Sequence, residues 1–422
     1  MSDIKKHSSE NPVIQLENHL PSESLNLISM IGELAAEEKV GLYLVGGAVR
    51  DLLLGRANFD LDLVVEGDAP KLAILVAQKT RGKVLIHRRF GTAKLRSGGQ
   101  TIDLATARSE SYARPGALPT VRPGSIKDDL KRRDFTINAM AIHLNPDSFG
   151  KLVDPFEGKK DLKSKLIRIL HGKSFIDDAT RMLRAIRYEQ RFGFHIEKST
   201  ELLLRQHLSM LDTISGDRIR HELELILKEE LPEKPLGRAG ELGLLDKVHP
   251  SLKGNGWLKD KFQQARSIAH PTPPALYFAL LTYPLSQGKA EDFVVRLKMP
   301  GLTARAIRDT LHLKSKLPSL AGPGLSPSAV YRLLQEYSPT SILACTIASD
   351  SALVQQRLHL YLNNWRHVKT SLDGVALQHM GIPQGPQLGQ MLRLLHEAKL
   401  DGRVNTREQE IEMVQLWLAQ EI

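Results

Sequence analysis

The sequence has almost no cysteine and no long apolar run. A single residue, Cys345, excludes an internal disulfide and indicates a reducing compartment. No apolar segment approaches the ~20 residues that a membrane-spanning helix needs, and residues 1–20 lack the apolar core of a signal peptide. We therefore expect a cytoplasmic protein that does not contact a membrane.

Histidine patterns that bind metals and internal repeats are also missing. The 15 histidines are scattered, without a His-Asp dipeptide or a His-x-x-x-His pair, which argues against an appended metal-dependent phosphohydrolase domain. No repeat or low-complexity tract stands out. Positive charge, by contrast, is in excess: 58 Lys and Arg against 48 Asp and Glu give a net charge of +10. This excess suits an acidic partner such as RNA, and the 422 residues suffice for roughly two to four domains.

The chain is organised around residues 43–65, YLVGGAVRDLLLGRANFDLDLVV. An apolar strand breaks at Gly46-Gly47, a short helical segment follows, and an alternating strand, DLDLVV, begins at Asp60. Because alternate residues of a strand share a face, Asp60 and Asp62 are expected to lie side by side.

This arrangement suits a phosphate-bearing substrate and a divalent cation. Mg²⁺ in proteins commonly uses one or two carboxylates plus substrate phosphate oxygens. The two glycines let the chain approach a phosphate at the beginning of a helix, where the N–H groups favour anions. Arg50 is then placed to grip a triphosphate and Asp51 to pair with an arginine. A lone Asp-x-Asp also marks many solvated sheet faces, so the inference depends on the order strand, Gly-Gly, helix and Asp-x-Asp strand.

Together, LVGGAVRD, LLLGR and DLDLVV resemble the first motif of the class II tRNA nucleotidyltransferases, the family of bacterial CCA-adding enzymes and poly(A) polymerases. The resemblance covers nearly the whole chain and is strongest from Tyr43 to Phe194. It implies an α+β fold, in which a polymerase beta-like nucleotidyltransferase head, a mixed sheet with helices, precedes an all-helical neck, body and tail. The expected parts are a frayed tail at 1–21, the catalytic head at 22–150, a neck that recognises the base at 151–230, a helical body at 231–320 and a tRNA-binding helical tail at 321–422.

The head is expected to contain several further elements. The patterns predict helices at 22–38, capped by Ser22 or Ser24, and 71–80, and strands at 83–87, 92–96 and 101–104. Asp103 lies where polymerase beta-like heads often place a third carboxylate near the metal pair; the alternative is a salt bridge to Arg108 or another arginine of the head.

Residues 108–125 contain three prolines and two glycines, a composition that resists regular structure. In the resembling family this position holds a flexible loop, which is shortened in relatives that add only cytidines. The loop looks close to full length here.

Residues 128–142, DDLKRRDFTINAMAI, resemble the family's RRDFTxNA motif. The resemblance implies that Arg132 or Arg133 contacts the triphosphate and that Asp134 and Asn138 help to hold the sugar and the surrounding loops. Without it, two adjacent arginines would more often form a solvated basic face. A further match at 152–169 links the head to the neck through a turn whose role is positional.

Residues 175–194, FIDDATRMLRAIRYEQRFGF, resemble the family's EDxxR site. Ser174 and Asp177 form a capping-box-like start, and Asp178 and Arg181 are expected on one helical face. A carboxylate accepts from the amine of cytosine or adenine, and a guanidinium donates to the adjacent ring nitrogen, so this pair would select C and A against G and U. The alternative is an ordinary salt bridge worth ~0.2–0.5 kcal/mol.

Other charged residues of the neck and tail are assigned by the same resemblance. Arg184 and Arg187 would contact the triphosphate or support the structure. The family's usual Glu is Asp177 here; a capping role tolerates the shorter acid, whereas a role in bracing the arginine would alter nucleotide choice. Residues 216–224 are expected to hold the neck together, and residues 380–392 to form a link into a helix that either cradles a tRNA phosphate or binds nothing.

The function implied is template-independent addition of CMP and AMP to the 3′ end of tRNA, from CTP and ATP, with release of pyrophosphate. Asp60 and Asp62 would bind two Mg²⁺ ions, with Asp103 as a further candidate ligand. Gly46, Gly47 and Arg50 would hold the nucleotide together with the residues of the RRDFTxNA motif. The basic body and tail would grip the tRNA acceptor end and elbow, and neither DNA nor a membrane is expected as a partner.

Several alternatives remain open at this point. Within the class they are an enzyme that adds only A, one that adds only CC, and a poly(A) polymerase. The full-length loop disfavours CC addition alone, and no appended nucleic-acid-binding extension supports a poly(A) polymerase. From a different class, the chain would be an inactive RNA-binding relative, against which the intact Asp60 and Asp62 argue.

Overall fold

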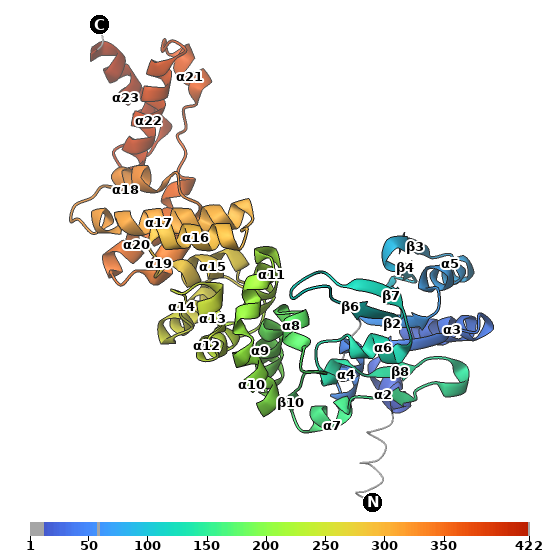
Figure 1. Ribbon diagram of the computed structural model, residues 1–422. Helices are drawn as coiled ribbons and strands as arrows, with labels where there is room; N and C mark the ends of the chain where they lie inside the picture. The colour runs from blue at the N-terminus through green and yellow to red at the C-terminus, as the bar shows by residue number, and fades with distance from the viewer. Residues whose placement is uncertain (1–11, 57–59, 421–422) are drawn as a thin grey trace, which may run out of the picture. The chain divides into compact units, whose positions relative to one another are not determined.

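The computed structural model describes residues 12–56 and 60–420 (Figure 1). The chain divides into two compact units, the first formed by residues up to Glu222 together with 241–247 and the second by residues 223–240 and 248–422. The first unit contains the predicted mixed sheet together with the first elements of the neck. Among the described residues, no helix is both long enough and apolar enough to cross a bilayer.

A seven-stranded mixed sheet forms the centre of the first unit. Its order is β3-β4-β5-β2-β1-β8-β9, with β2 and β5 parallel and the other neighbours antiparallel. The strands are β1 (Gly41–Val45), β2 (Leu61–Glu66), β3 (Lys83–His87), β4 (Thr92–Ser97), β5 (Gln100–Thr106), β8 (Ala141–His143) and β9 (Leu152–Val153). The predicted strands of the head are thus confirmed to within two residues at each end. On β2, Leu61 and Leu63 are buried and Asp62 is exposed, which is the alternation that placed the aspartate on the open face.

Helices complete the first unit, and α5 lies beside β3 and β4 of the sheet (Figure 1). They are α2 (Pro12–His19), α3 (Ser22–Glu37), α4 (Gly47–Leu53), α5 (Ala69–Thr80), α6 (Ile126–Lys131), α7 (Gly158–Lys163), α8 (Ser174–Asp177), α9 (Thr180–Phe192), α10 (Lys198–Gln206) and α11 (Gly216–Leu227), which continues into the second unit. The expectation of a frayed segment up to residue 21 is wrong for 12–19, because α2 contacts α4 and Leu16 is buried; residues 1–11 lie outside the described range. Neither serine caps α3: the N-cap is Pro21, and Ser24 donates to Gln100 instead.

Residues 108–125 are more regular than their composition indicates. Strands β6 (Arg108–Ser111) and β7 (Thr120–Pro123) form an antiparallel hairpin, and only its tip lies outside the strands. The prediction of irregular structure is therefore wrong at both ends of the segment. Each strand of a two-stranded sheet has an unpaired edge, and proline is tolerated on such an edge because its missing N–H is not needed there.

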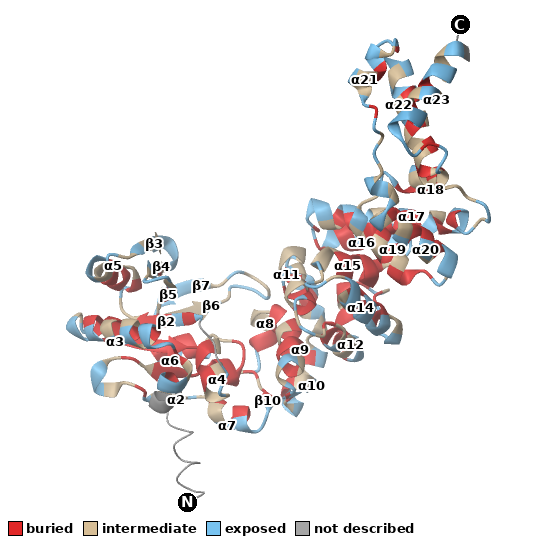
Figure 2. Ribbon diagram, turned by 180° about the vertical axis from the view of Figure 1, so that it is seen from behind, coloured by how far each residue is buried: buried red, intermediate tan, exposed pale blue. Residues whose placement is uncertain are grey.

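The chain after α11 is helical. Its helices are α12 (Glu233–Glu241), α13 (Leu244–Val248), α14 (Gly256–Ile268), α15 (Pro274–Thr282), α16 (Gln287–Arg296), α17 (Gly301–Leu320), α18 (Pro327–Leu334), α19 (Pro339–Ala348), α20 (Ala352–Asn363), α21 (Gly374–His379), α22 (Pro386–Leu400) and α23 (Arg407–Gln420). In Figure 2, α15 is buried along most of its length, as its run of apolar residues requires. Pro232 lies in the break between α11 and α12, and α12 accepts Pro235 in its first turn.

The neck is not entirely helical. Two short strands, β10 (Leu166–Ile167) and β11 (His195–Ile196), form a parallel pair on either side of α9 in the sequence. The expectation of an all-helical neck therefore needs this correction. The pair closes the turn after α9, where Gly193 takes the left-handed conformation that ends the helix.

Candidate active site

Carboxylates gather where β2 and β5 run side by side. Asp62 lies on β2, Asp60 immediately precedes that strand, and Asp103 of β5 is paired directly with Asp62. Partial burial raises the pKa of Asp62, and the negative charges of Asp103 and Asp60 raise it further, although Arg133 opposes the shift. The site therefore concentrates negative charge that a cation would neutralise.

These oxygen ligands fit a hard divalent cation. Among residues 12–56 and 60–420, no group of three or more His, Cys, Asp and Glu side chains is arranged to hold a metal by itself. Mg²⁺ commonly takes one or two carboxylates and completes its shell with substrate phosphate oxygens and water, which Asp60 and Asp62 would allow. An oxygen of Asp103 lies 3.1 Å from Nζ of Lys94. Asp103 therefore forms the ion pair that was the alternative to metal binding, but with a lysine and not with an arginine of the head.

A buried aspartate orients the two arginines of the RRD sequence. Asp129 on α6 is fully buried, and its Oδ1 accepts hydrogen bonds from Nε and Nη2 of Arg132 at 3.0 and 2.7 Å. Its Oδ2 accepts a hydrogen bond from Nη2 of Arg133 at 2.9 Å. Helix α6 is itself fixed by a capping box between Ser125 and Asp128. Two guanidinium groups are thereby held next to the carboxylates.

Most of the predicted nucleotide-binding residues converge on one cleft of about 440 Å³ in the first unit. Those that line it are Gly47, Arg50, Asp62, Arg132, Arg133, Asp134, Asn138, Asp178, Arg181 and Arg184. A second hollow of similar volume adjoins it, because Asp62, Arg132 and Arg133 line both, and Asp103 lines the second. The arrangement offers one space for a nucleotide and a neighbouring space at the carboxylates. Gly46, Asp60 and Arg187 line neither space.

Gly46 and Arg50 are fixed by contacts within the head. Gly46 has φ +70°, and a Cβ atom there would collide with Nη1 of Arg133, so this position requires glycine. Arg50 donates from Nε and Nη2 to Asp51 at 2.9 Å each and from Nη1 to Oδ1 of Asn138 at 2.6 Å. The prediction that Asp51 pairs with an arginine is confirmed, and the partner is Arg50 itself. A triphosphate contact by Arg50 would therefore use a guanidinium in a fixed orientation.

Asp134 connects the head to α9 of the neck. Its Oδ1 accepts from Nδ2 of Asn138 at 2.9 Å, and its Oδ2 accepts from Nε and Nη2 of Arg184 at 2.9 and 2.5 Å. Burial alone would raise the pKa of Asp134, but the charge of Arg184 and the hydrogen bonds from Asn138 and Arg184 outweigh it and hold the pKa below its usual value. Arg184 and Arg187 also face Glu222 of α11, at 3.6 and 3.4 Å. For Arg187, this geometry favours the structural alternative.

Asp178 and Arg181 do not lie on one helical face as predicted. Ser174–Asp177 form the separate helix α8, without a capping box, and Asp178 has an extended conformation before α9. The reason is local hydrogen bonding: Oδ1 of Asp178 accepts from the backbone N–H and the hydroxyl of Thr180 at 2.9 and 2.6 Å, which competes with the helix. Ser174 instead accepts from Nη1 of Arg181 at 2.7 Å.

Both residues nevertheless face the same cleft. Arg181 is buried, and its Nη2 donates to the backbone oxygen of Arg132 at 2.7 Å. Within the part of the chain that the structure describes, the hydrogen bonds of the Asp178 side chain all reach Oδ1, which leaves Oδ2 as an acceptor. An acceptor and a donor are therefore both available in the cleft.

Comparisons with known proteins agree with this geometry. A family model described as "Poly A polymerase head domain" matches residues 42–168. Another, described as "Probable RNA and SrmB-binding site of polymerase A", matches residues 193–254. A protein of Halalkalibacterium halodurans named A-adding tRNA nucleotidyltransferase is 35% identical over 411 residues, with 96% of this chain and 95% of that protein covered. The chain belongs to the tRNA nucleotidyltransferase family.

Two further relatives support this family membership. A protein of Geobacter sulfurreducens, also named A-adding tRNA nucleotidyltransferase, is 36% identical over 419 residues, with 94% of this chain but 48% of that protein covered; the chain thus spans about half of its length. The structure titled "Thermotoga maritima CCA-adding enzyme complexed with tRNA_CCA" is 33% identical in sequence and has a TM-score of 0.78. The superposition covers 97% of this chain and 98% of that chain. Proteins of this family are enzymes, and their polymerase beta-like head agrees with the fold described above.

The β6–β7 hairpin contributes residues that the family motifs did not point to. Glu110 accepts hydrogen bonds at Oε1 from Nη1 of Arg132 at 3.1 Å and at Oε2 from the hydroxyl of Tyr112 at 3.0 Å. Burial and the charge of Glu110 raise the pKa of Tyr112 to about 12, so this hydroxyl stays protonated. Both residues line the nucleotide cleft. The β6–β7 hairpin, at the position where the sequence predicts the family's loop, is therefore attached through a carboxylate to a candidate triphosphate-binding arginine.

Two neighbouring residues of the neck differ in their relation to Asp178 and the cleft. Arg218 of α11 donates from Nη2 to Oδ1 of Asp178 at 2.7 Å and from Nη1 to the backbone oxygen of Gly116 in the hairpin tip at 3.2 Å. Asp177, where the family usually has Glu, does not line the cleft and lies 4.0 Å from Nε2 of His171. No local pattern in the sequence could have linked Arg218 to Asp178, since the two are 40 residues apart.

Glu110→Gln is expected to tighten the binding of ATP by roughly threefold to tenfold. The substitution removes a negative charge that now competes with a triphosphate for Arg132, and Coulomb interactions of this size persist at close range. The dissociation constant of ATP can be measured by isothermal titration calorimetry. The control is Glu157→Gln, which removes an exposed carboxylate whose partner is Lys160. Equal affinities for the wild type and Glu110→Gln would show that Glu110 does not restrain Arg132.

Proposed function

We propose that this chain transfers AMP from ATP to the 3′ end of tRNA molecules that lack the terminal adenosine. The observation that carries the proposal is that one cleft is lined by a carboxylate of the Asp-x-Asp pair, by the paired arginines and by Asp178 and Arg181. The two relatives with 35% and 36% identity, both named for addition of A, support the choice of nucleotide.

The residues divide the work along the cleft. Arg132 and Arg133, oriented by Asp129, would bind the triphosphate with its α-phosphate toward Asp62. Oδ2 of Asp178 would accept a hydrogen bond from the N6 amine of adenine, and Arg181 would donate to the neighbouring ring nitrogen. Guanine presents a carbonyl in place of this amine, so each mismatched group would lose about 1–3 kcal/mol. Selection would therefore need no nucleic-acid template.

Asp60 and Asp62 would hold two Mg²⁺ ions, with Asp103 as a further candidate ligand. When bound, such ions polarise the RNA 3′-hydroxyl and stabilise the developing charge on the α-phosphate and on the leaving pyrophosphate. The carboxylates would hold the ions where this charge is neutralised. Arg133, whose positive charge lowers the pKa of Asp62 more than that of Lys94 does, would also interact with the phosphate.

Complete CCA addition is the second candidate. The likeness to the Thermotoga maritima CCA-adding enzyme extends over nearly the whole of both chains, and Asp178 and Arg181 would accept cytosine by the same hydrogen bonds as adenine. The nearly full-length hairpin does not favour addition of CC alone. The tRNA would be the partner in either case, acting in the cytoplasm, where the unpaired thiol of Cys345 is also stable.

Asp178→Ala is expected to relax selection against GTP and UTP. Without the acceptor, a carbonyl at the base edge no longer faces a carboxylate, so the ratio of kcat/KM for ATP to that for GTP should fall by about tenfold or more. The measurement is single-nucleotide extension of a tRNA transcript ending in CC. The control is Asp177→Ala, which removes the neighbouring carboxylate outside the cleft. Unchanged selectivity in a folded Asp178→Ala protein would show that Asp178 serves only as the ion-pair partner of Arg218.

The proposed activity is tested with three tRNA transcripts, ending before CCA, after C and after CC. Each is incubated with labelled ATP and CTP, separately and together. Extension of the third transcript by ATP, with no extension of the other two by CTP, is the expected result. Extension of the first transcript to full CCA would replace the first candidate by the second, and no extension of any transcript would refute both.

A further inference from the structure

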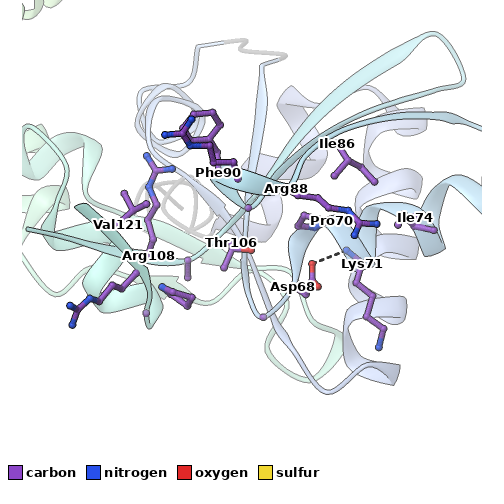
Figure 3. Close-up of a pocket in the computed structure, with 17 residues that line it drawn as sticks. Asp68, Pro70, Lys71, Ile74, Ile86, Arg88, Phe90, Thr106, Arg108 and Val121 are labelled. Atoms are coloured by element: carbon purple, nitrogen blue, oxygen red, sulfur yellow. Dashed lines mark hydrogen bonds between the residues drawn. The ribbon is translucent and has the colours of Figure 1, made fainter. Parts of the chain in front are cut away.

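A separate hollow of the head, of about 760 Å³, shares no lining residue with the catalytic cleft or the hollow beside it (Figure 3). Its walls come from α5, from the 3₁₀ turn η1 (Arg88–Phe90) after β3, from the end of β5 and from β7 of the hairpin. Its volume lies in the range of small-molecule binding pockets. Nothing in the catalytic mechanism uses it.

One part of the lining is apolar and includes an exposed aromatic ring. Phe90 is 58% exposed, although it lies on a short turn between two paired strands. In the view of Figure 3, Phe90 lies between Val121 of the hairpin on one side and Ile86 on the other, with Ile74 of α5 beyond. The guanidinium carbon of Arg89 lies 5.8 Å from the centroid of this ring, so a base would stack on the part of the ring that Arg89 leaves exposed.

The other part of the lining is strongly basic. Five basic side chains face one acid, Asp68, whose carboxylate is engaged as the cap of α5. Lys71 pairs with Glu38, and Arg108 pairs with Glu110 at 3.2 Å. The remaining three arginines have no carboxylate partner among the described residues; they are Arg88, Arg89 and Arg122. Uncompensated guanidinium groups around a hollow attract an anion with several negative charges.

We infer that this hollow is a second nucleotide-binding site, in which a base stacks on Phe90 and phosphates lie on Arg88 and Arg122. Each half of the lining excludes a simpler ligand. Inorganic phosphate would leave the apolar wall and the ring uncovered, and an apolar ligand would leave three guanidinium groups without an anion. A nucleotide combines a stackable base with phosphate.

The same chemistry has two sources, a free nucleoside triphosphate and an unpaired stretch of RNA. The inference goes beyond the proposed reaction, since it holds whichever nucleotide the catalytic cleft adds. For an RNA strand, the site would hold a segment away from the reacting 3′ end. For a free triphosphate, it would be a second binding site of the head.

The test is photocrosslinking of the full chain with two probes, 8-azido-ATP and a ten-nucleotide RNA that carries 4-thiouridine. Cleavage after lysine releases residues 84–94 as one peptide, and arginine substitutions do not change this cleavage. We expect adducts in this peptide with at least one probe. Adducts with only the RNA identify a strand as the ligand, and adducts with only 8-azido-ATP identify a free nucleotide.

The double variant Arg88→Ala/Arg122→Ala should lower the yield of adducts in this peptide by about tenfold, while adducts in the catalytic cleft are unchanged. If RNA is the ligand, its binding should also depend less steeply on salt, by about 0.7 in the log–log slope for each arginine removed. Arg96→Ala, which removes an exposed arginine of β4 outside the hollow, is the matched control. Phe90→Leu should weaken binding and Phe90→Trp should retain it. Absence of adducts in residues 84–94 with both probes, or equal yields in the double variant and the wild type, would overturn the inference.

Discussion

Asp62→Asn should lower AMP incorporation by at least about 10³-fold, because the site would lose a negative charge that holds the metal ions. The same substitution should raise the Tm of the metal-free protein. Burial and the neighbouring carboxylates raise the pKa of Asp62 in the folded state above its value in the unfolded chain. The folded state therefore binds more protons between these two pKa values, stability falls as the pH rises through that window, and ionised Asp62 destabilises the fold at neutral pH.

Thermal unfolding at pH 7 measures this second effect. Mg²⁺ should raise the Tm of the wild type, since a ligand that binds only the folded state stabilises it, and should leave the Tm of Asp62→Asn nearly unchanged. Asp147→Asn, which removes an exposed carboxylate of the head, is the control for general charge effects. Substantial incorporation by Asp62→Asn, or an equal response of both proteins to Mg²⁺, would refute the metal assignment.

Asp129→Asn is expected to impair both stability and activity. Asp129 is the buried acceptor for both arginines of the RRD sequence, and an amide in its place turns an Nδ2 donor toward a guanidinium. Loss of hydrogen bonds to a charged group costs about 1.5–3 kcal/mol in the free energy of unfolding. With Arg132 and Arg133 no longer aligned, kcat/KM for ATP should fall by roughly 10²-fold.

Urea unfolding and steady-state incorporation separate these two effects. Asp128→Asn is a close control, since this neighbouring carboxylate caps α6 and contacts neither arginine. It should lose some stability through the cap and keep its activity. If Asp129→Asn remained fully active in its folded form, the two arginines would not depend on Asp129 for their orientation.

Local patterns predicted the centre of the head well. The alternation of Asp60, Leu61, Asp62 and Leu63 fixes which side chains face the open side of β2, and the Gly-Gly break fixes where α4 begins, because both depend only on neighbouring residues. Strands β1 to β5 and helices α3 to α5 were predicted from the same short-range signals, whereas β8, β9 and α6 were not. The β6–β7 hairpin was not predicted. The composition of the segment shows its prolines, but it does not show that each strand has an unpaired edge, where proline is tolerated.

The candidate site shows where short-range reasoning ends. The sequence spacing predicted that Asp178 and Arg181 lie on one helix. Hydrogen bonds from Thr180 instead hold Asp178 outside α9, and both residues still line the same cleft. The contacts of Glu110 with Arg132 and of Arg218 with Asp178 join segments 22 and 40 residues apart. Such pairs depend on how the elements pack and have no periodic signal.

The central claim is that Asp178 reads the amine of the incoming base. The most direct test compares ATP with purine riboside triphosphate, which lacks the 6-amino group, as substrates for a tRNA ending in CC. In the wild type, loss of the amine should lower kcat/KM by about tenfold or more. In Asp178→Ala the two nucleotides should react nearly equally, because the energies of a protein group and a substrate group that contact each other are coupled. The same penalty in both proteins would contradict the account.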